Sequence, residues 1–349
     1  MLRNPAVWLL AVLALGSALA DGAGTRVVLY RGFAEVVRPV AVKDGVWVWN
    51  PGEAAPVPGT LRLFGLVERK RVWQGDAVVF FTEGSGPARL GYLTRALSGR
   101  LDYALDLDAG TLTAWVTVEN RGPTLRADEL WYVAGAVPLV GEGGGGPKLA
   151  TKRLALAAAP AEAAYQGAAG GVFRYRFAGG AELVRGRTEL PFQRGAVRPL
   201  FLWRYRGGFV KGDRLVFQRG YRFDAPWPLA AGRVSLWKAG AFLGQATLPD
   251  RPQGEPVEFW LGPDPLGRAE RKVEVLEETR ERARYRVTTR LENRHAEPVR
   301  VEIEERFPTR GYQLKIAGAE RVPGGYRLGL DLAPGGRWTY VYEVTLLYR

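Results

Sequence analysis

Cysteine is absent from the 349 residues of this sequence. Its absence excludes disulfide bonds, thiolate metal sites and a cysteine nucleophile, and it excludes lipid attachment at a cysteine behind a signal sequence. A chain of this length can be stable without such cross-links, because it can bury a large hydrophobic core.

Histidine is almost as scarce, since His295 is the only one. Without a second histidine or a cysteine, a histidine-rich zinc site cannot form, and Ser-His-Asp catalysis would depend on this single side chain. His295 follows Asn293 and Arg294, and we expect it to be an exposed turn residue. The sequence therefore predicts no catalytic, metal-binding or cofactor-binding residue.

Long apolar runs are confined to the N-terminus. Residues 1–20 are typical of a secretory signal peptide: Arg3 is basic, Ala6–Leu15 is apolar, and Ala18–Ala20 is a small-x-small cleavage pattern before Asp21. An uncleaved anchor is the alternative, although the run is short for a membrane-spanning helix of about 20 residues. We predict cleavage after Ala20 and an exported protein in the periplasm or at the cell surface.

Acidic residues are fewer than basic ones. Lysine and arginine number 49, aspartate and glutamate 36, and the formal net charge is +13. Such a balance in an exported protein favours acidic envelope polymers, anionic lipid headgroups or acidic proteins as partners, and we expect no nucleic-acid partner. The plainer interpretation is that the arginines are dispersed over solvated strand faces.

Most of the sequence consists of short alternating segments separated by glycine, proline and aspartate turns. The most regular stretch is Trp260–Phe307, in which apolar residues recur at every second position. A similar passage is Trp115–Val133, and each of the two contains a strand, a Glu-Asn-Arg turn and another strand. This pattern predicts an all-β chain of antiparallel β-sandwich modules, with two expected and helix a minor component.

Turn residues and composition suggest the module boundaries. Two prolines in Asp224–Pro228 would interrupt strand pairing. A Gly/Ala-rich excursion covers 141–171, within which Leu149–Ala159 is expected to form a short helix, or a strand followed by a loop. The predicted organisation is a signal peptide (1–20), a strand-rich segment that packs on the next module (21–90), a first sandwich (91–224) and a C-terminal sandwich (225–349).

Several stretches in order resemble the bacterial domain of unknown function 4139, the carboxy-terminal region of the mucoidy inhibitor A-like proteins. They are Leu101–Tyr103, Trp115–Asn120 with Ala127–Leu130, Leu229–Gly244, Gly262–Pro265 and Tyr285–Asn293. The resemblance extends from about Gly91 to Arg349, and no single motif within it is specific.

This resemblance implies a β-rich exported protein, and the family has no established catalytic residues to transfer to this chain. Longer members commonly carry a coiled coil and another domain before this region, whereas here only the strand-rich residues 21–90 lie between the signal and the resemblance.

Two loop motifs superficially resemble binding sites. Asp106–Gly110 looks like the start of a calcium loop, but Thr117 stands where the later acidic ligand is required, and a hairpin turn is expected instead. Gly143–Gly146 is followed by Pro147–Leu149 and lacks the Gly-Lys-Ser/Thr ending of a phosphate-binding loop. We interpret it as a plain loop.

Carboxylates are the only candidates for catalysis. Glycoside hydrolysis requires two of them about 5 to 9 Å apart. The candidates are Glu277, Glu278, Glu302, Glu304 and Glu305. Alternation places Glu302 and Glu304 on one strand face with neighbouring arginines, so a solvated face explains them without catalysis. We therefore predict that the protein is not an enzyme.

The 11 tryptophans are the remaining candidates for binding, and they include Trp47, Trp49, Trp227, Trp237 and Trp260. Tryptophan can stack on sugars or anchor a protein partner, but it also fills the cores of sandwiches. Trp47 and Trp49 share one strand face. We expect most tryptophans to be core residues.

The leading functional hypothesis is a non-enzymatic envelope protein that binds an envelope protein or an acidic polysaccharide, with peripheral membrane contact as a further option. The sequence carries no signal for a particular oligomeric state. An outer-membrane β-barrel is the first alternative, because Tyr340, Tyr342, Val344, Leu346 and Tyr348 alternate up to the C-terminus. A carboxylate-dependent glycan hydrolase is the second.

Overall fold

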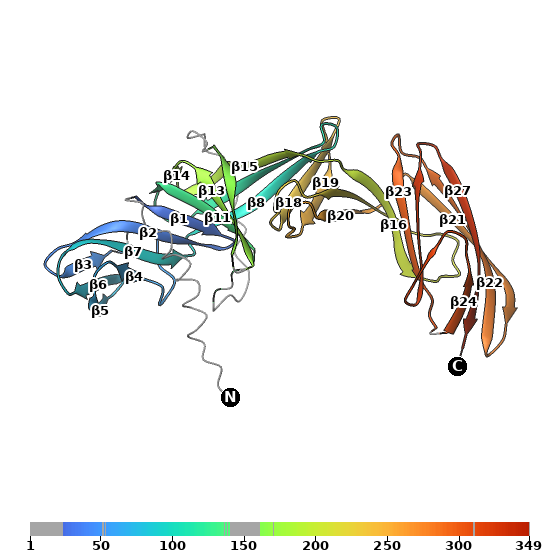
Figure 1. Ribbon diagram of the computed structural model, residues 1–349, viewed down its shortest axis with the longest axis horizontal. Coiled ribbons are helices and arrows are strands. Elements are labelled where there is room, and N and C mark those ends of the chain that lie inside the picture. Colours follow the sequence, from blue (N-terminus) through green and yellow to red (C-terminus); the bar gives the residue numbers. More distant parts are fainter. Residues whose placement is uncertain are drawn as a thin grey trace. The chain divides into compact units, whose positions relative to one another are not determined.

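A computed structural model shows an all-β protein (Figure 1). It describes residues 24–50, 52, 54–135, 137, 139, 161–169, 171–309 and 311–348. The predicted signal peptide, the glycine run at 143–146 and the possible helix at 149–159 lie outside this range. No helix occurs within it, and the prediction of antiparallel-rich β-sandwich modules is confirmed.

The chain divides into two compact units, Met1–Asp102 with Ala114–Gln193, and Tyr103–Thr113 with Arg194–Arg349. The expected boundary near 224–225 lies inside the second unit. Ala225 and Trp227 are buried there, so the stretch with the two prolines forms part of a packed corner.

The first unit is built on a seven-stranded sheet that includes strands from the predicted 21–90 segment. The order across it is β12 (Ala161–Ala169), β13 (Val172–Ala178), β11 (Glu129–Ala134), β1 (Arg26–Tyr30), β2 (Phe33–Val42), β7 (Gly86–Thr94) and β4 (Arg62–Phe64). The facing layer contains β15 (Gly186–Ala196), β9 (Thr111–Asn120) and β8 (Leu97–Asp106). Phe192 of this layer packs against Tyr132 and Tyr175 of the larger sheet, at ring-centroid distances of 5.7 and 4.7 Å.

Two small sheets complete the first unit. One has the order β3 (Val46–Trp49), β6 (Ala77–Thr82) and β5 (Glu68–Gln74), and the other pairs β10 (Leu125–Ala127) with β14 (Ala181–Leu183).

The second unit contains a six-stranded sheet with the order β20 (Pro256–Pro263), β17 (Gln218–Asp224), β16 (Leu200–Gly208), β23 (Val299–Arg306), β26 (Gly325–Leu332) and β25 (Glu320–Val322). The second layer has the order β21 (Gly267–Glu278), β22 (Arg282–Asn293), β27 (Arg337–Leu347) and β24 (Gly311–Lys315). The C-terminal alternation is explained by this core, because Tyr340, Tyr342, Val344 and Leu346 are all buried.

A hairpin of β18 (Gly232–Lys238) and β19 (Ala241–Leu248) also belongs to the second unit. It lies next to the tip of the β8–β9 hairpin, residues 103–113, where the backbone N–H of Leu107 donates to the carbonyl of Trp237.

The two large sheets repeat one arrangement of strands. In chain order and in sheet order, β1, β2, β7, β11 and β13 correspond to β16, β17, β20, β23 and β26. Each set contains one parallel pair, β1 with β11 and β16 with β23, flanked by antiparallel pairs. Parallel pairing requires a long crossover, so its recurrence at the same place indicates a duplicated sandwich.

The predicted Glu-Asn-Arg turns occupy equivalent corners of the two sandwiches. Asn120 and Asn293 are both buried, and the Oδ1 of each accepts the backbone N–H two residues later at 2.9 Å. Each side-chain amide also donates to the end of a distant strand, to the carbonyl of Leu183 at 2.8 Å and of Leu332 at 3.1 Å. A buried amide whose donors and acceptor are all used fixes the chain direction after the strand.

Candidate functional site: an arginine-rich groove on the second sandwich

Charged side chains cover the outer face of the six-stranded sheet because its strands alternate. Trp203 and Tyr205 of β16 point into the core, and Arg204 and Arg206 therefore point outward. Parallel pairing with β23 sets each arginine beside a carboxylate, Arg204 beside Glu302 and Arg206 beside Glu304.

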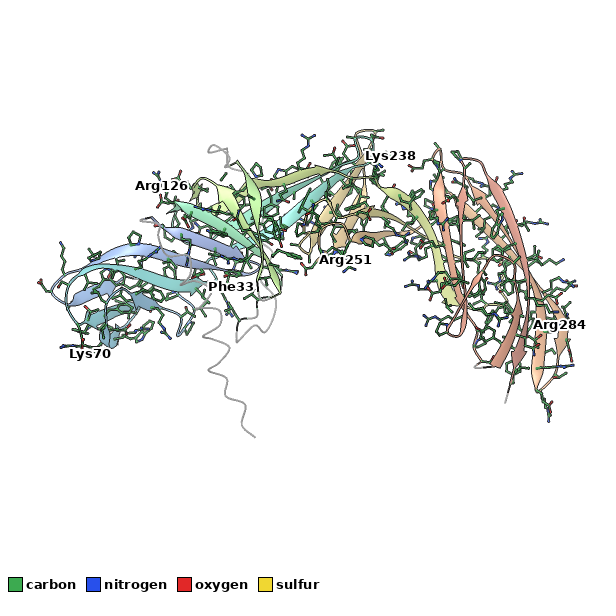
Figure 2. The ribbon with its side chains drawn as sticks, viewed as in Figure 1. Phe33, Lys70, Arg126, Lys238, Arg251 and Arg284 are labelled. Carbon is green, nitrogen blue, oxygen red and sulfur yellow. The ribbon has the colours of Figure 1, made fainter. Side chains whose placement is uncertain are left out.

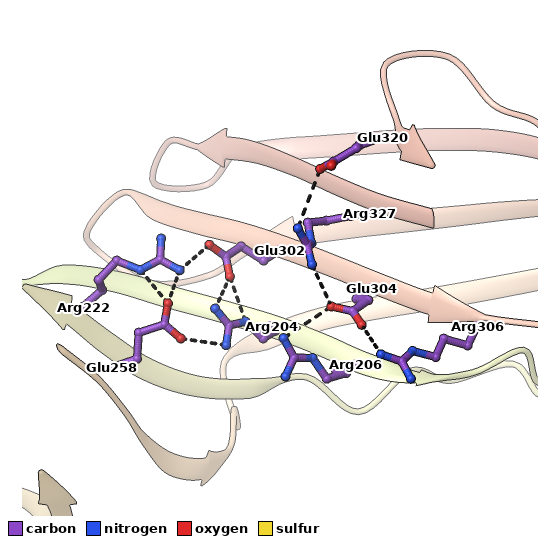
Figure 3. A network of polar contacts seen from close by, with 9 residues as sticks. All are labelled: Arg204, Arg206, Arg222, Glu258, Glu302, Glu304, Arg306, Glu320 and Arg327. Atoms are coloured by element: carbon purple, nitrogen blue, oxygen red, sulfur yellow. Dashed lines mark hydrogen bonds and ion pairs between the residues drawn. The ribbon is translucent and has the colours of Figure 1, made fainter. Parts of the chain in front are cut away.

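Four of these side chains form a closed ring of ion pairs (Figure 3). The guanidinium group of Arg204 donates to Glu302 at 2.7 Å and to Glu258 at 2.9 Å, and that of Arg222 donates to the same two carboxylates at 2.7 Å each. The Arg204 guanidinium also lies 4.4 Å from the ring centroid of Trp260. Burial opposes ionisation of Glu258, but hydrogen bonds from both arginines hold its pKa below the ordinary value. The ring is electrically balanced and rigid.

The neighbouring part of the face has more positive charge. Glu304 is buried, with 7% of its side chain exposed, and contacts Arg206, Arg306 and Arg327 at 3.3, 3.0 and 3.4 Å. More than half of each of these three arginine side chains is exposed. Burial would raise the pKa of Glu304, but hydrogen bonds and charge from the arginines lower it. Arg327 also pairs with Glu320 at 3.7 Å. Glu304 thus contacts three cations, and Arg206 and Arg306 keep further N–H donors on their exposed side chains.

A cavity of about 360 Å³ runs over both clusters. Its charged lining consists of five arginines and three glutamates: Arg204, Arg206, Arg222, Arg300, Arg327, Glu302, Glu304 and Glu320. Gly329 leaves room for the long side chains, because a Cβ atom there would lie 2.7 Å from Nη2 of Arg300.

The groove is suited to holding an anion. A guanidinium group has five N–H donors, and carboxylate or phosphate groups accept them in pairs. General-acid catalysis by Glu304 is disfavoured, because it would require a raised pKa and the surrounding arginines lower it.

The other predicted carboxylates lie apart from the groove. Glu305 points into the core and forms an ion pair with Arg271 at 2.7 Å, with at most 1% of either side chain exposed. Glu277 pairs with Arg282 at 2.6 Å at the far end of the β21–β22 hairpin. Glu278, in the same hairpin, pairs with a lysine at 2.9 Å. Of the five candidates, only Glu302 and Glu304 line the groove.

His295 is not an exposed turn residue, contrary to the prediction. Only 11% of its side chain is exposed, and its Nε2 lies 2.8 Å from Oδ2 of Asp264, whose side chain is fully buried. The two residues belong to different corners, after β20 and after β22, and the corners meet in space. Burial would raise the pKa of the Asp264 carboxyl, but hydrogen bonds from His295 and the Leu266 N–H hold it below the ordinary value.

Asp106–Gly110 forms the hairpin turn that was predicted. Oδ1 of Asp106 accepts the backbone N–H groups of Asp108 and Ala109 at 3.0 and 2.9 Å. Within the described residues, no three histidine, aspartate or glutamate side chains gather in a way that could hold a metal ion. The same residues include no helix long and apolar enough to cross a membrane.

The described tryptophans differ in burial. Four of the ten are buried, fewer than the majority that was expected: Trp49, Trp131, Trp203 and Trp227. Trp47, Trp115, Trp260 and Trp338 are partly buried. Trp73 and Trp237 are 53% and 41% exposed. Alternation alone does not distinguish buried from exposed tryptophans, because both occur in strands.

The groove itself was not predicted from the sequence, since its arginines come from four strands that are distant in the chain. The alternation of Arg204 with Arg206 was the available signal. Neither a protein-family model nor a curated protein matches this chain, so the family resemblance stays a prediction.

Proposed function

We propose that this chain is a non-enzymatic, exported cell-envelope protein that binds an acidic envelope partner through the groove of the second sandwich. One observation carries the proposal: five arginines and only three glutamates line a concave site on the sheet, and two of the arginines, Arg206 and Arg327, are more than half exposed. The predicted signal peptide and the resemblance to the domain of unknown function 4139 support export. The net charge of +13 supports attraction of an acidic partner over longer distances.

The mechanism follows from the two halves of the groove. The balanced ring around Arg204 forms one half of the groove. In the other half, the exposed side chains of Arg206 and Arg327 provide N–H donors. An acidic polymer would exchange hydration for paired N–H contacts with Arg206 and Arg327 without rearrangement of the strands.

The test compares two double variants that lose the same charge. Arg206→Ala/Arg327→Ala changes the groove, whereas Arg69→Ala/Arg126→Ala removes two exposed arginines of the first unit. Polygalacturonate and poly-L-glutamate serve as polysaccharide and polypeptide probes, and calorimetry measures their affinity at several salt concentrations.

We expect the groove variant to bind at least one probe on the order of tenfold more weakly, with a smaller salt dependence. The control variant should bind like the wild type. Absence of wild-type binding to both probes, or equal losses in the two variants, would contradict the proposal.

A further inference from the structure

The outward face of the β18–β19 hairpin carries a row of side chains suited to a different kind of ligand. Antiparallel register sets three pairs side by side on this face: Trp237 with Phe242, Ser235 with Gln245, and Arg233 with Thr247. The row thus begins with an aromatic pair, continues with a hydroxyl and an amide, and ends with a cation and a hydroxyl.

This face is open while the opposite face is packed. Trp237 and Phe242 are 41% and 53% exposed, whereas Val234, Leu236 and Leu248 on the other side are fully buried. Core packing therefore does not account for the two aromatic rings, and exposed large aromatics are typical of binding surfaces.

The aromatic end of the hairpin is held in place. Its turn contains Ala239 with a φ of 48°, a left-handed conformation that is unfavourable for a residue other than glycine. The backbone N–H of Ala239 donates to Oδ2 of Asp108, and Lys238 forms an ion pair with Glu297 at 2.8 Å. Lys238 marks this end of the hairpin in Figure 2. The backbone that carries the two rings is thus anchored before a ligand binds.

The polar part of the row is also preorganised. Nε2 of Gln245 donates to Oγ of Ser235 at 3.0 Å, which leaves the carbonyl oxygen of the amide and its second N–H for a ligand. Trp237 and Phe242 meet at a ring-centroid distance of 5.4 Å and an interplanar angle of 62°, so the two ring faces point in different directions.

We infer that this face binds a polysaccharide chain. A sugar ring has an apolar C–H face that stacks on an aromatic ring, and hydroxyl groups around its edge that pair with amides and hydroxyls. The row sets one aromatic pair beside two polar pairs over roughly 14 Å, given the rise of about 3.4 Å per residue of a strand.

This site does not depend on the groove, and salt separates the two. Stacking and neutral hydrogen bonds are little affected by ionic strength, whereas binding of an acidic polymer to arginines weakens as salt screens the charges. Binding of a neutral polysaccharide should therefore persist from roughly 50 to roughly 500 mM NaCl.

The experiment is affinity electrophoresis of the full chain through gels that contain soluble neutral polysaccharides, namely β-glucan, xylan, mannan and glycol chitin. Trp237→Ala/Phe242→Ala removes the aromatic pair. Trp73→Ala is the control, because Trp73 is an exposed tryptophan of the first unit, at 53% against 41% for Trp237. Circular dichroism establishes that each variant is folded, and Trp237→Phe tests whether an aromatic ring is sufficient.

We expect at least one polysaccharide to retard the wild type, and the double variant to bind it on the order of tenfold more weakly. The control variant and Trp237→Phe should be retarded as much as the wild type. The groove variant Arg206→Ala/Arg327→Ala should also be retarded as much as the wild type. Failure of every polysaccharide to retard the wild type, or unchanged retardation of the double variant, would overturn the inference. If the groove variant lost acidic probes while the hairpin variant kept all sugars, only the proposed function would stand.

Discussion

The outer faces of the first and second sandwiches carry different chemistry on the same pairing of strands. In the first sandwich Trp131 of β11 pairs with Val28 on one side and Arg176 on the other. The equivalent residue of the second sandwich is Glu302 of β23, which pairs with Arg204 and Gly329. Trp131 stacks with arginine guanidinium groups, whereas Glu302 accepts hydrogen bonds from them. Backbone pairing is thus shared by the two copies, and the outward side chains are free to diverge.

The cores differ in a similar way. Ala134 pairs with Phe173 in the first sandwich, and the equivalent pair in the second is Glu305 with Tyr326. Glu305 accepts a hydrogen bond from the Tyr326 hydroxyl at 2.8 Å and forms its ion pair with Arg271. In the first sandwich the apolar Ala134 occupies the position of Glu305, so the fold does not require a buried ion pair there.

The largest expected effect comes from separating that ion pair. Arg271→Met leaves the Glu305 carboxylate buried without its cation and should destabilise the second unit by about 3–5 kcal/mol. Urea unfolding of the full chain measures this loss. The double variant Arg271→Met/Glu305→Leu imitates the apolar first sandwich and should recover part of it, because the Tyr326 and Tyr342 hydroxyls lose the acceptor that Glu305 provides. A double variant as unstable as the single one would show that the two cores are not interchangeable.

A smaller and more equal effect is expected at the two turn asparagines. Asn120→Ala and Asn293→Ala each leave buried carbonyl groups without a donor, and each should cost about 1–3 kcal/mol in unfolding experiments. Asn→Asp at either position keeps the acceptor for the following N–H but loses the donors, so its cost should also be substantial. If only one of the two sandwiches responded, the turns would not be equivalent.

The turn after β7 in the first sandwich and the equivalent turn after β20 in the second differ in how their contribution to stability depends on pH. In the first sandwich Thr94 Oγ1 accepts the N–H of Ala96, and in the second Asp264 accepts that of Leu266 and also contacts His295. Because the folded-state pKa of Asp264 is lowered, its stabilising contribution is full above the unfolded pKa of about 3.9 and is lost as pH falls through the folded value.

His295→Gly should therefore lower stability most above about pH 4, and its difference from the wild type should shrink at lower pH. The part due to lost packing on Phe201, at a ring-centroid distance of 4.7 Å, does not depend on Asp264 and should remain. Urea unfolding at several pH values measures the difference. A difference that grew as the pH fell would contradict this assignment.

The features that the sequence predicted correctly are those whose residues lie close together in the chain. Alternation indicated the strands, and the repeated Glu-Asn-Arg turns were recognisable because each is contained in a few consecutive residues. The parallel pair of β1 and β11 had no such signal. His295 was misjudged for the same reason, since its partner Asp264 lies 31 positions away in the chain. The groove depends on Arg204, Arg222 and Arg327, which only the folded sheet brings together.

The parallel pairs also bear on how the chain folds. Val27 pairs with Leu130, and Trp203 with Val301, so each sheet is closed at its centre by residues about a hundred positions apart. Contacts of such high sequence separation require loop closure before they contribute stability, and domains dominated by them fold in milliseconds to seconds. The two parallel pairs use separate stretches of chain, so each pair can form before or after the other during folding.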